Sequence, residues 1–333
     1  METFESNHFD YQDSDTEETF YNEQKSSVDR KKILDFIHNV SFSIITQLTN
    51  SNFPSIIIRS KGLTPFLRHL NFSNPNNTEQ IALYVKLLSL IQKLIERDQY
   101  ATKRDLFYQL KPLFKTQASL DSLLNDLART IQVPRSSLHI LTTPKGQIAG
   151  YLELITADGN VIKFKDTREA TAIPNFLDSI KDIRTNAKFV LIIEKDSTLQ
   201  RFLDDNFLQK YPGVLITGKG EPDINTRRFV NMLYKKFKSK MKFLCLTDAN
   251  PYGILISSVY KYGSREFSYD KDLNVSSLEW IGLKLSDLEN FHLKNKNNFL
   301  LQLNDRDKTI AKNLIAKFEK LNEHELINEV TLI

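Results

Sequence analysis

The chain has very little sulfur and no long apolar run. Its 333 residues include one cysteine, Cys245, and three methionines. A single cysteine excludes an internal disulfide framework and any zinc site built on several cysteines. Cys245 lies in the apolar segment MKFLCL, where we expect a buried, inert thiol in a reducing compartment. No stretch approaches the roughly 18 apolar residues of a membrane span, and the acidic N-terminus predicts no secretory signal.

Several common functional motifs are also missing. The six histidines show no metal-ligand spacing, and no Ser–His–Asp hydrolase arrangement is indicated. No Gly-x-Gly-x-x-Gly motif is present, which argues against a dinucleotide cofactor. The segment GKG at 218–220 lacks the remainder of a Walker motif, so we expect no ATPase fold.

Charge is distributed unevenly along the chain. Nine of the 41 acidic residues and one of the 45 basic residues lie in residues 1–29, so residues 30–333 hold 44 bases against 32 acids. We interpret residues 1–29 as an acidic, disordered tail, because they lack sustained apolar periodicity. A basic body of this kind favours a polyanion partner such as nucleic acid, although most basic surfaces are simply solvated.

The first half of the chain reads as short helices followed by β-rich segments. Apolar residues recur at helical spacing from Lys31 onward, over 81–98 and over 118–132. Thr102 and Asp105 form a helix-start box for a short helix that carries Tyr108. Two β-rich runs within 138–156 are joined by a Pro-Lys-Gly turn. Helices followed by such a hairpin are typical of a winged-helix domain, and any small α+β domain is the alternative.

The second half alternates apolar strands with helices. The strands KFVLIIE (188–194), GVLIT (213–217) and KFLCLTD (242–248) are each followed by a helical pattern. Continuous apolar strands of this kind predict a parallel sheet covered by helices on both faces. Residues 166–333 are therefore predicted to form an α/β domain.

Two acidic residues follow strands of this predicted sheet directly. Glu194 follows the first strand and Asp248 the third, and Lys219 lies after the second. Ligands of open parallel sheets bind beyond the carboxyl ends of the strands, and Mg²⁺ commonly takes one or two carboxylates there together with water and phosphate. Taken singly, either acid would more often be a structural helix-start residue than a ligand.

The ordered set of segments resembles a known family. A strand followed by Glu, then GKGEPD, then Asp-x-Asn-Pro-x-Gly resembles the Toprim domain of topoisomerase VI A proteins, a family that includes eukaryotic meiotic relatives, with fungal double-strand-break transesterases the nearest likeness. KRDLFYQLKPLF is similar to the family's Arg-Asp-x-x-Tyr segment and PKGQIAGYL to its wing, while YKYGS (260–264) and LEWIGL (278–283) match later segments. The resemblance covers residues 30–333. It implies a winged-helix (CAP-like) domain over 30–165 followed by a Toprim (Rossmann-like) domain over 166–333.

The resemblance assigns roles residue by residue. Tyr108 takes the place of the DNA-cleaving nucleophile and Arg104 that of the basic residue near it. Because Arg104 precedes Tyr108 by four positions, both side chains should share one helix face. Glu194 and Asp248 take metal-ligand places, and Asn250 stands where the family most often has a second Asp. One Mg²⁺ is therefore expected, and a second should bind more weakly or depend on DNA phosphate.

The resemblance also implies an activity and its partners. Tyr108 would attack a DNA phosphate, leaving a 5′-phosphotyrosyl link and a free 3′-hydroxyl, and two chains would supply each composite site. The implied partners are duplex DNA, a second copy of the chain, a topoisomerase VI B-like protein and a WD-repeat accessory protein, on chromosomes in the nucleus. The expected phosphate contacts, besides Arg104, are Lys103, Arg135, Lys145 and Lys219.

Two other functional classes remain open from sequence. The replacement by Asn250 is compatible with a non-catalytic DNA-binding or scaffold paralogue that needs no metal. A Toprim nuclease or primase is the other alternative. It would leave no protein-linked DNA end.

Overall fold

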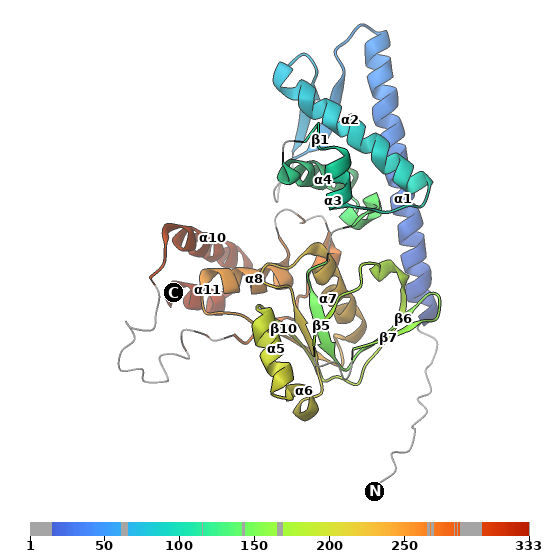
Figure 1. The fold of residues 1–333 in the computed structure, drawn as a ribbon. Coiled ribbons are helices and arrows are strands. Elements are labelled where there is room, and N and C mark those ends of the chain that lie inside the picture. Colours follow the sequence, from blue (N-terminus) through green and yellow to red (C-terminus); the bar gives the residue numbers. More distant parts are fainter. Residues whose placement is uncertain are drawn as a thin grey trace.

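The computed structural model describes residues 15–60, 66–114, 116–141, 144–164, 169–264, 267, 270–282, 284, 286 and 302–332. These residues form two units, one above the other in Figure 1, and each has its own apolar core. Residues 1–14 of the predicted tail and Leu283 of the LEWIGL segment lie outside this part of the chain. No helix in the part described has the length and apolar composition needed to cross a membrane.

Helix α1 corrects the prediction of a disordered tail over its described part. It runs from Asp15 to Thr49, so residues 15–29 are helical. Ile33 and Ile37 bury its inner face, and Asp29 accepts a hydrogen bond of 2.9 Å from the Ser137 hydroxyl. Once packing has nucleated a helix, each added residue gains a backbone hydrogen bond at little further cost. A polar extension of a packed helix shows no apolar periodicity, so the sequence pattern did not predict this part of α1.

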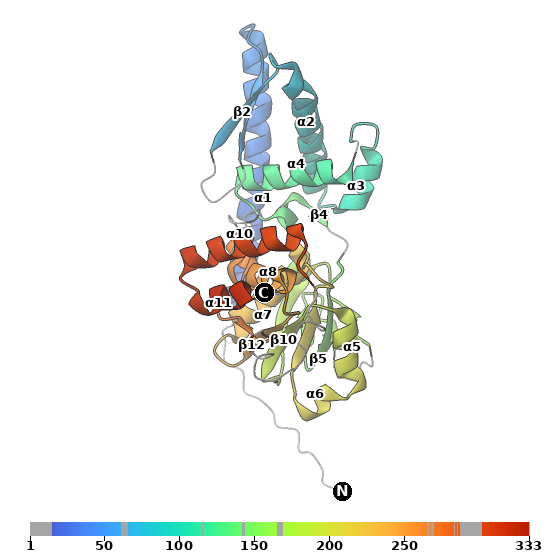
Figure 2. The same cartoon turned by 90° about the vertical axis from the view of Figure 1, so that its left-hand side faces the viewer.

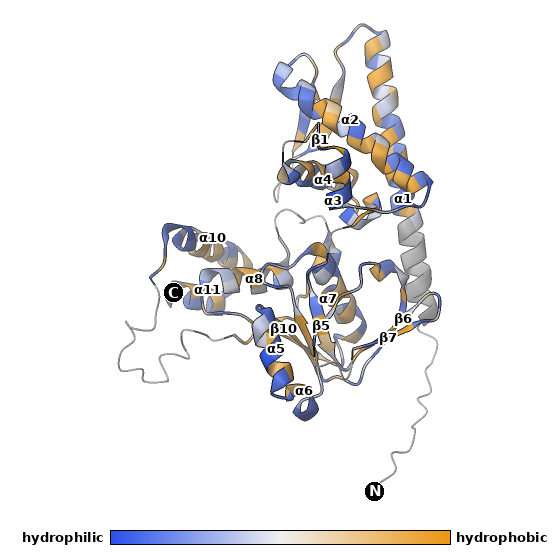
Figure 3. Ribbon diagram, viewed as in Figure 1, coloured by the Kyte–Doolittle hydropathy of each residue, from blue (hydrophilic) through white to orange (hydrophobic). Residues whose placement is uncertain are grey.

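The first unit is mainly helical. Its apolar core combines one face of α1 with α2, α3 and α4 and with a short hairpin, β1–β2, that was not predicted. Figure 3 shows apolar and polar residues dividing the surface of α2 between two faces. After α1 the elements are β1 (Ser55–Arg59), β2 (Leu67–Asn71), α2 (Pro75–Glu96), β3 (Ala101–Thr102), α3 (Lys103–Gln109), α4 (Gln117–Ile131) and β4 (Ile140–Leu141).

The predicted hairpin over 138–156 is wrong. Strand β4 pairs in parallel with β3 of the first unit, whereas β5 (Gln147–Gly150) pairs antiparallel with β11 of the second unit and with β8 (Thr171–Ala172). An isolated two-stranded hairpin is marginal in water, and β11 offers β5 a fully buried strand instead. The PKGQIAGYL segment is therefore part of the second sheet.

The second unit contains the predicted parallel sheet. Its strand order is β13-β12-β10-β11-β5-β8, with β10 paired in parallel to both β11 and β12. A separate three-stranded sheet has the order β7-β6-β9. The strands are β6 (Glu153–Thr156), β7 (Val161–Lys163), β9 (Ile180–Arg184), β10 (Phe189–Ile193), β11 (Val214–Thr217), β12 (Lys242–Leu246) and β13 (Glu279–Trp280).

Helices cover both faces of this sheet, as the continuous apolar strands predict. Val190 and Ile192 of β10 pack with α7 and α8, whereas Leu191 and Ile193 pack with α5 and α6. Helices α10 and α11 then pack on the outer side of α8 (Figure 2). The helices are α5 (Asp196–Asp204), α6 (Phe207–Lys210), α7 (Ile224–Phe237), α8 (Pro251–Tyr262), α10 (Asp305–Leu321) and α11 (His324–Leu332).

The two cores bear on the domain boundary expected at residue 165. The core of the first unit ends at Ile140 and that of the second begins at Ile148. The position of the domain boundary is still a prediction, and we now propose that it lies between Ile140 and Ile148.

The glycine at the end of β5 provides a stability test of this pairing. Gly150 has φ +126°, and a Cβ there would lie 2.3 Å from the carbonyl oxygen of Gly213. Because positive φ costs an L-residue roughly 1–2 kcal/mol and overpacking adds typically 1–3 kcal/mol, Gly150→Ala should lower the free energy of unfolding by about 3 kcal/mol. Urea denaturation followed by circular dichroism measures the change.

Gly159 is the matched control for this substitution. It also has positive φ, +84°, but a Cβ there meets no atom within 4 Å. Gly159→Ala should therefore cost only the backbone contribution, about 1 kcal/mol. Equal losses for the two variants would contradict the close approach of β5 to β11.

Candidate active site at the strand ends and on α3

Tyr108 lies on a short helix that is fixed at its first turn. The Thr102 hydroxyl accepts a hydrogen bond of 3.1 Å from the Asp105 backbone N–H and donates one of 2.6 Å to the Asp105 carboxylate. The predicted helix-start box is confirmed. Leu106 anchors the helix in the core at 1% exposure, whereas Tyr108 is 55% exposed. The phenol is therefore available to a macromolecular substrate.

Arg104 lies on the same helix face as Tyr108, as the four-residue spacing predicts. Its guanidinium carbon is 5.8 Å from the centroid of the Tyr108 ring, within the range of a cation–π contact. The guanidinium is thus available to the phenol or to an anion that approaches it.

The two predicted carboxylates meet at the carboxyl ends of neighbouring strands. The register that pairs Ile193 with Leu246 brings the residues that follow together. The backbone N–H of Asp248 donates a hydrogen bond of 3.0 Å to the Glu194 carboxylate. Burial, together with the nearby charge of Asp248, raises the pKa of Glu194, although that hydrogen bond and the charge of Lys195 oppose the shift.

Two charged residues of this crevice were missed from the sequence. Lys195 places its ammonium nitrogen 2.6 Å from a carboxylate oxygen of Asp248. Asp196 lies 3.5 Å from the ammonium nitrogen of Lys219. The sequence signal was the run Glu-Lys-Asp directly after a strand, which places charges of both signs at the crevice.

The GKG loop is held against the end of β10. The Gly220 N–H donates a hydrogen bond of 2.8 Å to the backbone oxygen of Glu194, and the Lys219 N–H donates one of 3.1 Å to the Thr217 hydroxyl. Lys219 has φ +52° and Gly220 has φ +85°. These bonds bring the Lys219 side chain to the same edge of the sheet as Glu194.

Asn250 has a structural task that its sequence position did not reveal. It is the N-cap of α8, and its side-chain oxygen accepts a hydrogen bond of 2.8 Å from the Gly253 N–H. A Cβ on Gly253 would lie 2.2 Å from the backbone oxygen of Asp248, so the turn requires glycine there. The Asn250 oxygen is thus already engaged, and its role as a metal ligand stays a prediction.

The donors at this crevice fit one hard cation. Glu194 and Asp248 supply carboxylate oxygens, and Mg²⁺ is commonly bound by one or two carboxylates with water completing the octahedron. Among the described residues, no group of three or more His, Cys, Asp or Glu side chains could form a cage made of protein alone. A magnesium ion here would share its coordination with water and phosphate.

The four lysines and arginines predicted to contact DNA differ in availability. Lys145 is exposed, whereas Lys103 forms an ion pair of 2.7 Å with Asp121. Arg135 is only 6% exposed and is bonded to Asn125 and Asp121 on α4. The Arg135 guanidinium is buried and bonded within the first unit. Both observations argue against a contact with a DNA phosphate.

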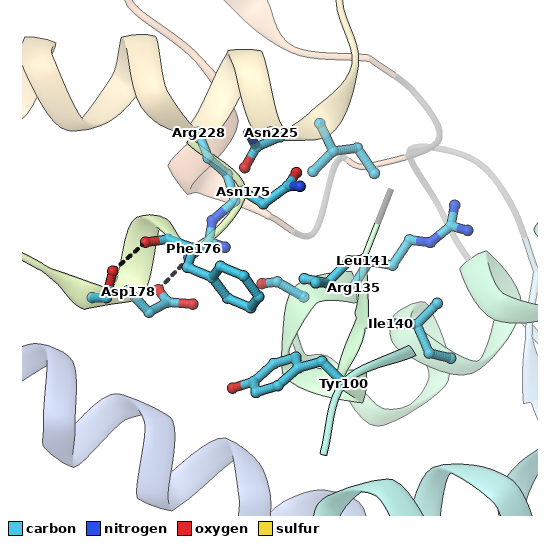
Figure 4. Close-up of a pocket in the computed structure, with 12 residues that line it drawn as sticks. Tyr100, Arg135, Ile140, Leu141, Asn175, Phe176, Asp178, Asn225 and Arg228 are labelled. Atoms are coloured by element: carbon cyan, nitrogen blue, oxygen red, sulfur yellow. Dashed lines mark hydrogen bonds and ion pairs between the residues drawn. The ribbon is translucent and has the colours of Figure 1, made fainter. Parts of the chain in front are cut away.

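A pocket between the two units lies apart from Tyr108 and from the acidic residues at the strand ends. Figure 4 shows Tyr100 of the first unit facing Phe176 of the second, at a ring-centroid distance of 5.7 Å. Tyr100 also stacks on His139 at 4.2 Å, and Arg228 pairs with Asp178 at 2.8 Å. Apart from Arg135, no predicted site residue lines it. We interpret it as part of the contact between the units.

Comparison with known proteins identifies both halves of the chain. The family model for the Toprim domain of topoisomerase 6 A/Spo11 proteins matches residues 189–333, and the model described as "Type IIB DNA topoisomerase" matches residues 79–140. The mouse meiotic recombination protein SPO11 is 36% identical over 315 residues, covering 89% of this chain and 79% of that protein. The human protein of the same name is 37% identical over 294 residues, covering 83% and 73%. The A subunit of DNA topoisomerase 6 from Arabidopsis thaliana is 34% identical over 224 residues, covering 67% and 52%.

The cap at Asn250 allows its structural and electrostatic roles to be separated. Asn and Asp cap helices about equally, whereas Ala at an N-cap costs about 1 kcal/mol. Asn250→Asp should therefore keep the stability of the chain and, by adding a carboxylate near Asp248, tighten Mn²⁺ binding. Asn250→Ala should lower stability by about 1 kcal/mol. Thermal unfolding and isothermal titration with Mn²⁺ measure the two effects, and unchanged Mn²⁺ affinity in Asn250→Asp would place this side chain outside the metal site.

Proposed function

The chain belongs to the Spo11/topoisomerase VI A family, and from this we propose how its own residues break DNA. It is a topoisomerase VI A-like, DNA-cleaving enzyme of the type IIB class that forms meiotic double-strand breaks. Its second half is a Toprim domain, a fold that generally binds a divalent metal ion. What remains to be assigned is the role of each side chain.

The exposed phenol of Tyr108 beside Arg104 carries the proposal. The Tyr108 oxygen attacks a backbone phosphorus and forms a 5′-phosphotyrosyl bond. The bond to the deoxyribose 3′-oxygen breaks, and that oxygen takes up a proton while the phenol loses one. One ester replaces another, so the exchange needs no ATP. An unperturbed phenol is only ~0.1% ionised at pH 7, and the guanidinium 5.8 Å from the ring stabilises the phenolate or holds the phosphate.

Glu194 and Asp248 would hold one Mg²⁺ at the crevice. When bound, the ion supplies positive charge for the non-bridging oxygens of the phosphate. Lys219, held at the same edge by the GKG loop, adds a further cation. Because Asn250 already caps α8, we propose that a second ion binds only with help from DNA phosphate.

The active site is proposed to combine two chains. Helix α3 packs against β3 and α4 of its own unit, whereas Glu194 and Asp248 follow strands of the other unit (Figure 1). By its resemblance to the topoisomerase VI A family, in which tyrosine and metal belong to different protomers, we propose that Tyr108 of one chain meets the carboxylates of a second copy. Two such sites would cut both strands of a duplex.

The remaining partners follow from the family and stay proposals. The first unit would act as the winged-helix domain on duplex DNA, with Lys103 at a phosphate, and Lys145 and Lys219 would add further phosphate contacts. Arg135 could join them only after its bonds to α4 open. A topoisomerase VI B-like protein and a WD-repeat protein would complete the assembly on chromosomes in the nucleus.

Removal of a single oxygen tests the nucleophile. Tyr108→Phe should abolish covalent protein–DNA complexes in meiotic cells, at least a hundredfold below the unmodified chain, while the protein accumulates normally because the side chain is exposed. Protein-linked 5′ ends are measured by immunoprecipitation under denaturing conditions.

Tyr211→Phe is the matched control, since Tyr211 is also a half-exposed tyrosine, 46%, but follows α6 in the second unit. It should leave the complexes unchanged. Persistent complexes in Tyr108→Phe would reject this nucleophile. Free 5′-phosphate ends would instead indicate a nuclease, and the absence of breaks with the unmodified chain would indicate a scaffold paralogue.

A complementation experiment tests the composite site. Tyr108→Phe and Glu194→Gln chains, produced in the same cells, should together form one intact site from the tyrosine of one and the carboxylates of the other. We expect covalent complexes only on the Glu194→Gln chain, distinguished by a size tag. Each variant produced alone should give none. If both variants together also give none, tyrosine and carboxylates act within one chain.

A further inference from the structure

The ammonium of Lys195 pairs with Asp248, one of the two carboxylates proposed to hold the cation. Its nitrogen lies 2.6 Å from a carboxylate oxygen of Asp248. The backbone N–H of the same Asp248 donates a hydrogen bond to the Glu194 carboxylate. This ion pair is the shorter of the two at the crevice, since Lys219 is 3.5 Å from Asp196.

An ammonium and a divalent ion cannot share this carboxylate at close range. Like charges a few ångströms apart repel strongly at a partly desolvated site. Glu194 and Asp248 carry two negative charges, Lys195 pairs with one of them, and Asn250 adds none, while the second lysine of the crevice, Lys219, lies near Asp196. The side chain of Lys195 is 53% exposed, so it can swing away without disrupting the core.

We propose that Lys195 is an internal counter-ion that neutralises Asp248 until a divalent cation binds, and that it then moves to the DNA phosphate. This inference rests on the metal site of the proposed function and assigns a positioning role to a residue beside it. The consequence is a coupling: the contribution of Lys195 to DNA binding is present only when the metal is bound. Such coupling is reciprocal, so DNA and metal strengthen each other's binding through this side chain.

The first measurement is metal affinity without turnover. In the Tyr108→Phe background, Lys195→Gln should bind Mn²⁺ about three- to tenfold more tightly, because the competing ammonium is gone. Lys210→Gln, at the end of α6, removes the same charge away from the crevice and should leave the affinity unchanged. Isothermal titration of the full chain with Mn²⁺ gives both values.

The second measurement is DNA affinity with and without metal. With a fluorescein-labelled duplex and saturating Mg²⁺, Lys195→Gln should bind at least about threefold more weakly, the loss of one phosphate contact. Without metal, the Lys195→Gln chain and the chain that retains Lys195 should bind the duplex equally, because Asp248 holds the Lys195 ammonium. Asp248→Asn releases Lys195 permanently, so this variant should show the stronger DNA binding in the absence of metal.

The outcomes separate this inference from the proposed metal site. If Glu194→Gln binds Mn²⁺ as well as the unmodified chain, the metal site itself fails. If Glu194→Gln loses Mn²⁺ while Lys195→Gln matches the unmodified chain, only the counter-ion role is overturned. The counter-ion role is also overturned if Lys195→Gln binds Mn²⁺ more weakly, or if it changes DNA affinity equally with and without metal. A merely structural ion pair would give those results.

Discussion

The hydrogen bond from the Asp248 backbone to the Glu194 carboxylate is the contact on which the proposed metal site depends. It exists because β10 and β12 pair in parallel and in register, so that both strands end at the same edge. The register is secured by burial on both faces of β10, where Val190 and Leu191 enter different cores. A shift by one residue would exchange those faces and separate the two acids.

Charge at this edge is partly neutralised by the protein itself. Lys195 pairs with Asp248, and Lys219 pairs with Asp196. Asn250 fits the same pattern, because a neutral cap satisfies the first turn of α8 without adding a third negative charge. The crevice is therefore stable without a cation, and a cation that enters must compete with an internal ammonium. A bound metal ion would release the Lys195 ammonium to a phosphate, and this exchange links metal binding to phosphate binding.

The two units divide the chemistry between them. The first presents Tyr108 on a short, capped helix, and the second gathers the acids at the strand ends. Strand β5 ties the units together, since the chain leaves β4 of the first unit and enters the sheet of the second directly. Sequence similarity suggested that the PKGQIAGYL segment forms a wing. In the structure its strand β5 instead connects the two units.

Sequence alone determined strands β10, β11 and β12, the helix-start box at Thr102 and the residue types at the ends of these strands, because these depend on local apolar pattern and on side-chain hydrogen bonds within a turn. It could not determine that β5 leaves its predicted hairpin partner, that α1 extends to Asp15, or that Arg135 is buried against α4. It also gave no sign that Lys195 pairs with Asp248, a residue 53 positions away. Those features depend on which distant surfaces bury the most apolar area and which charges are brought together, and only the tertiary structure decides that.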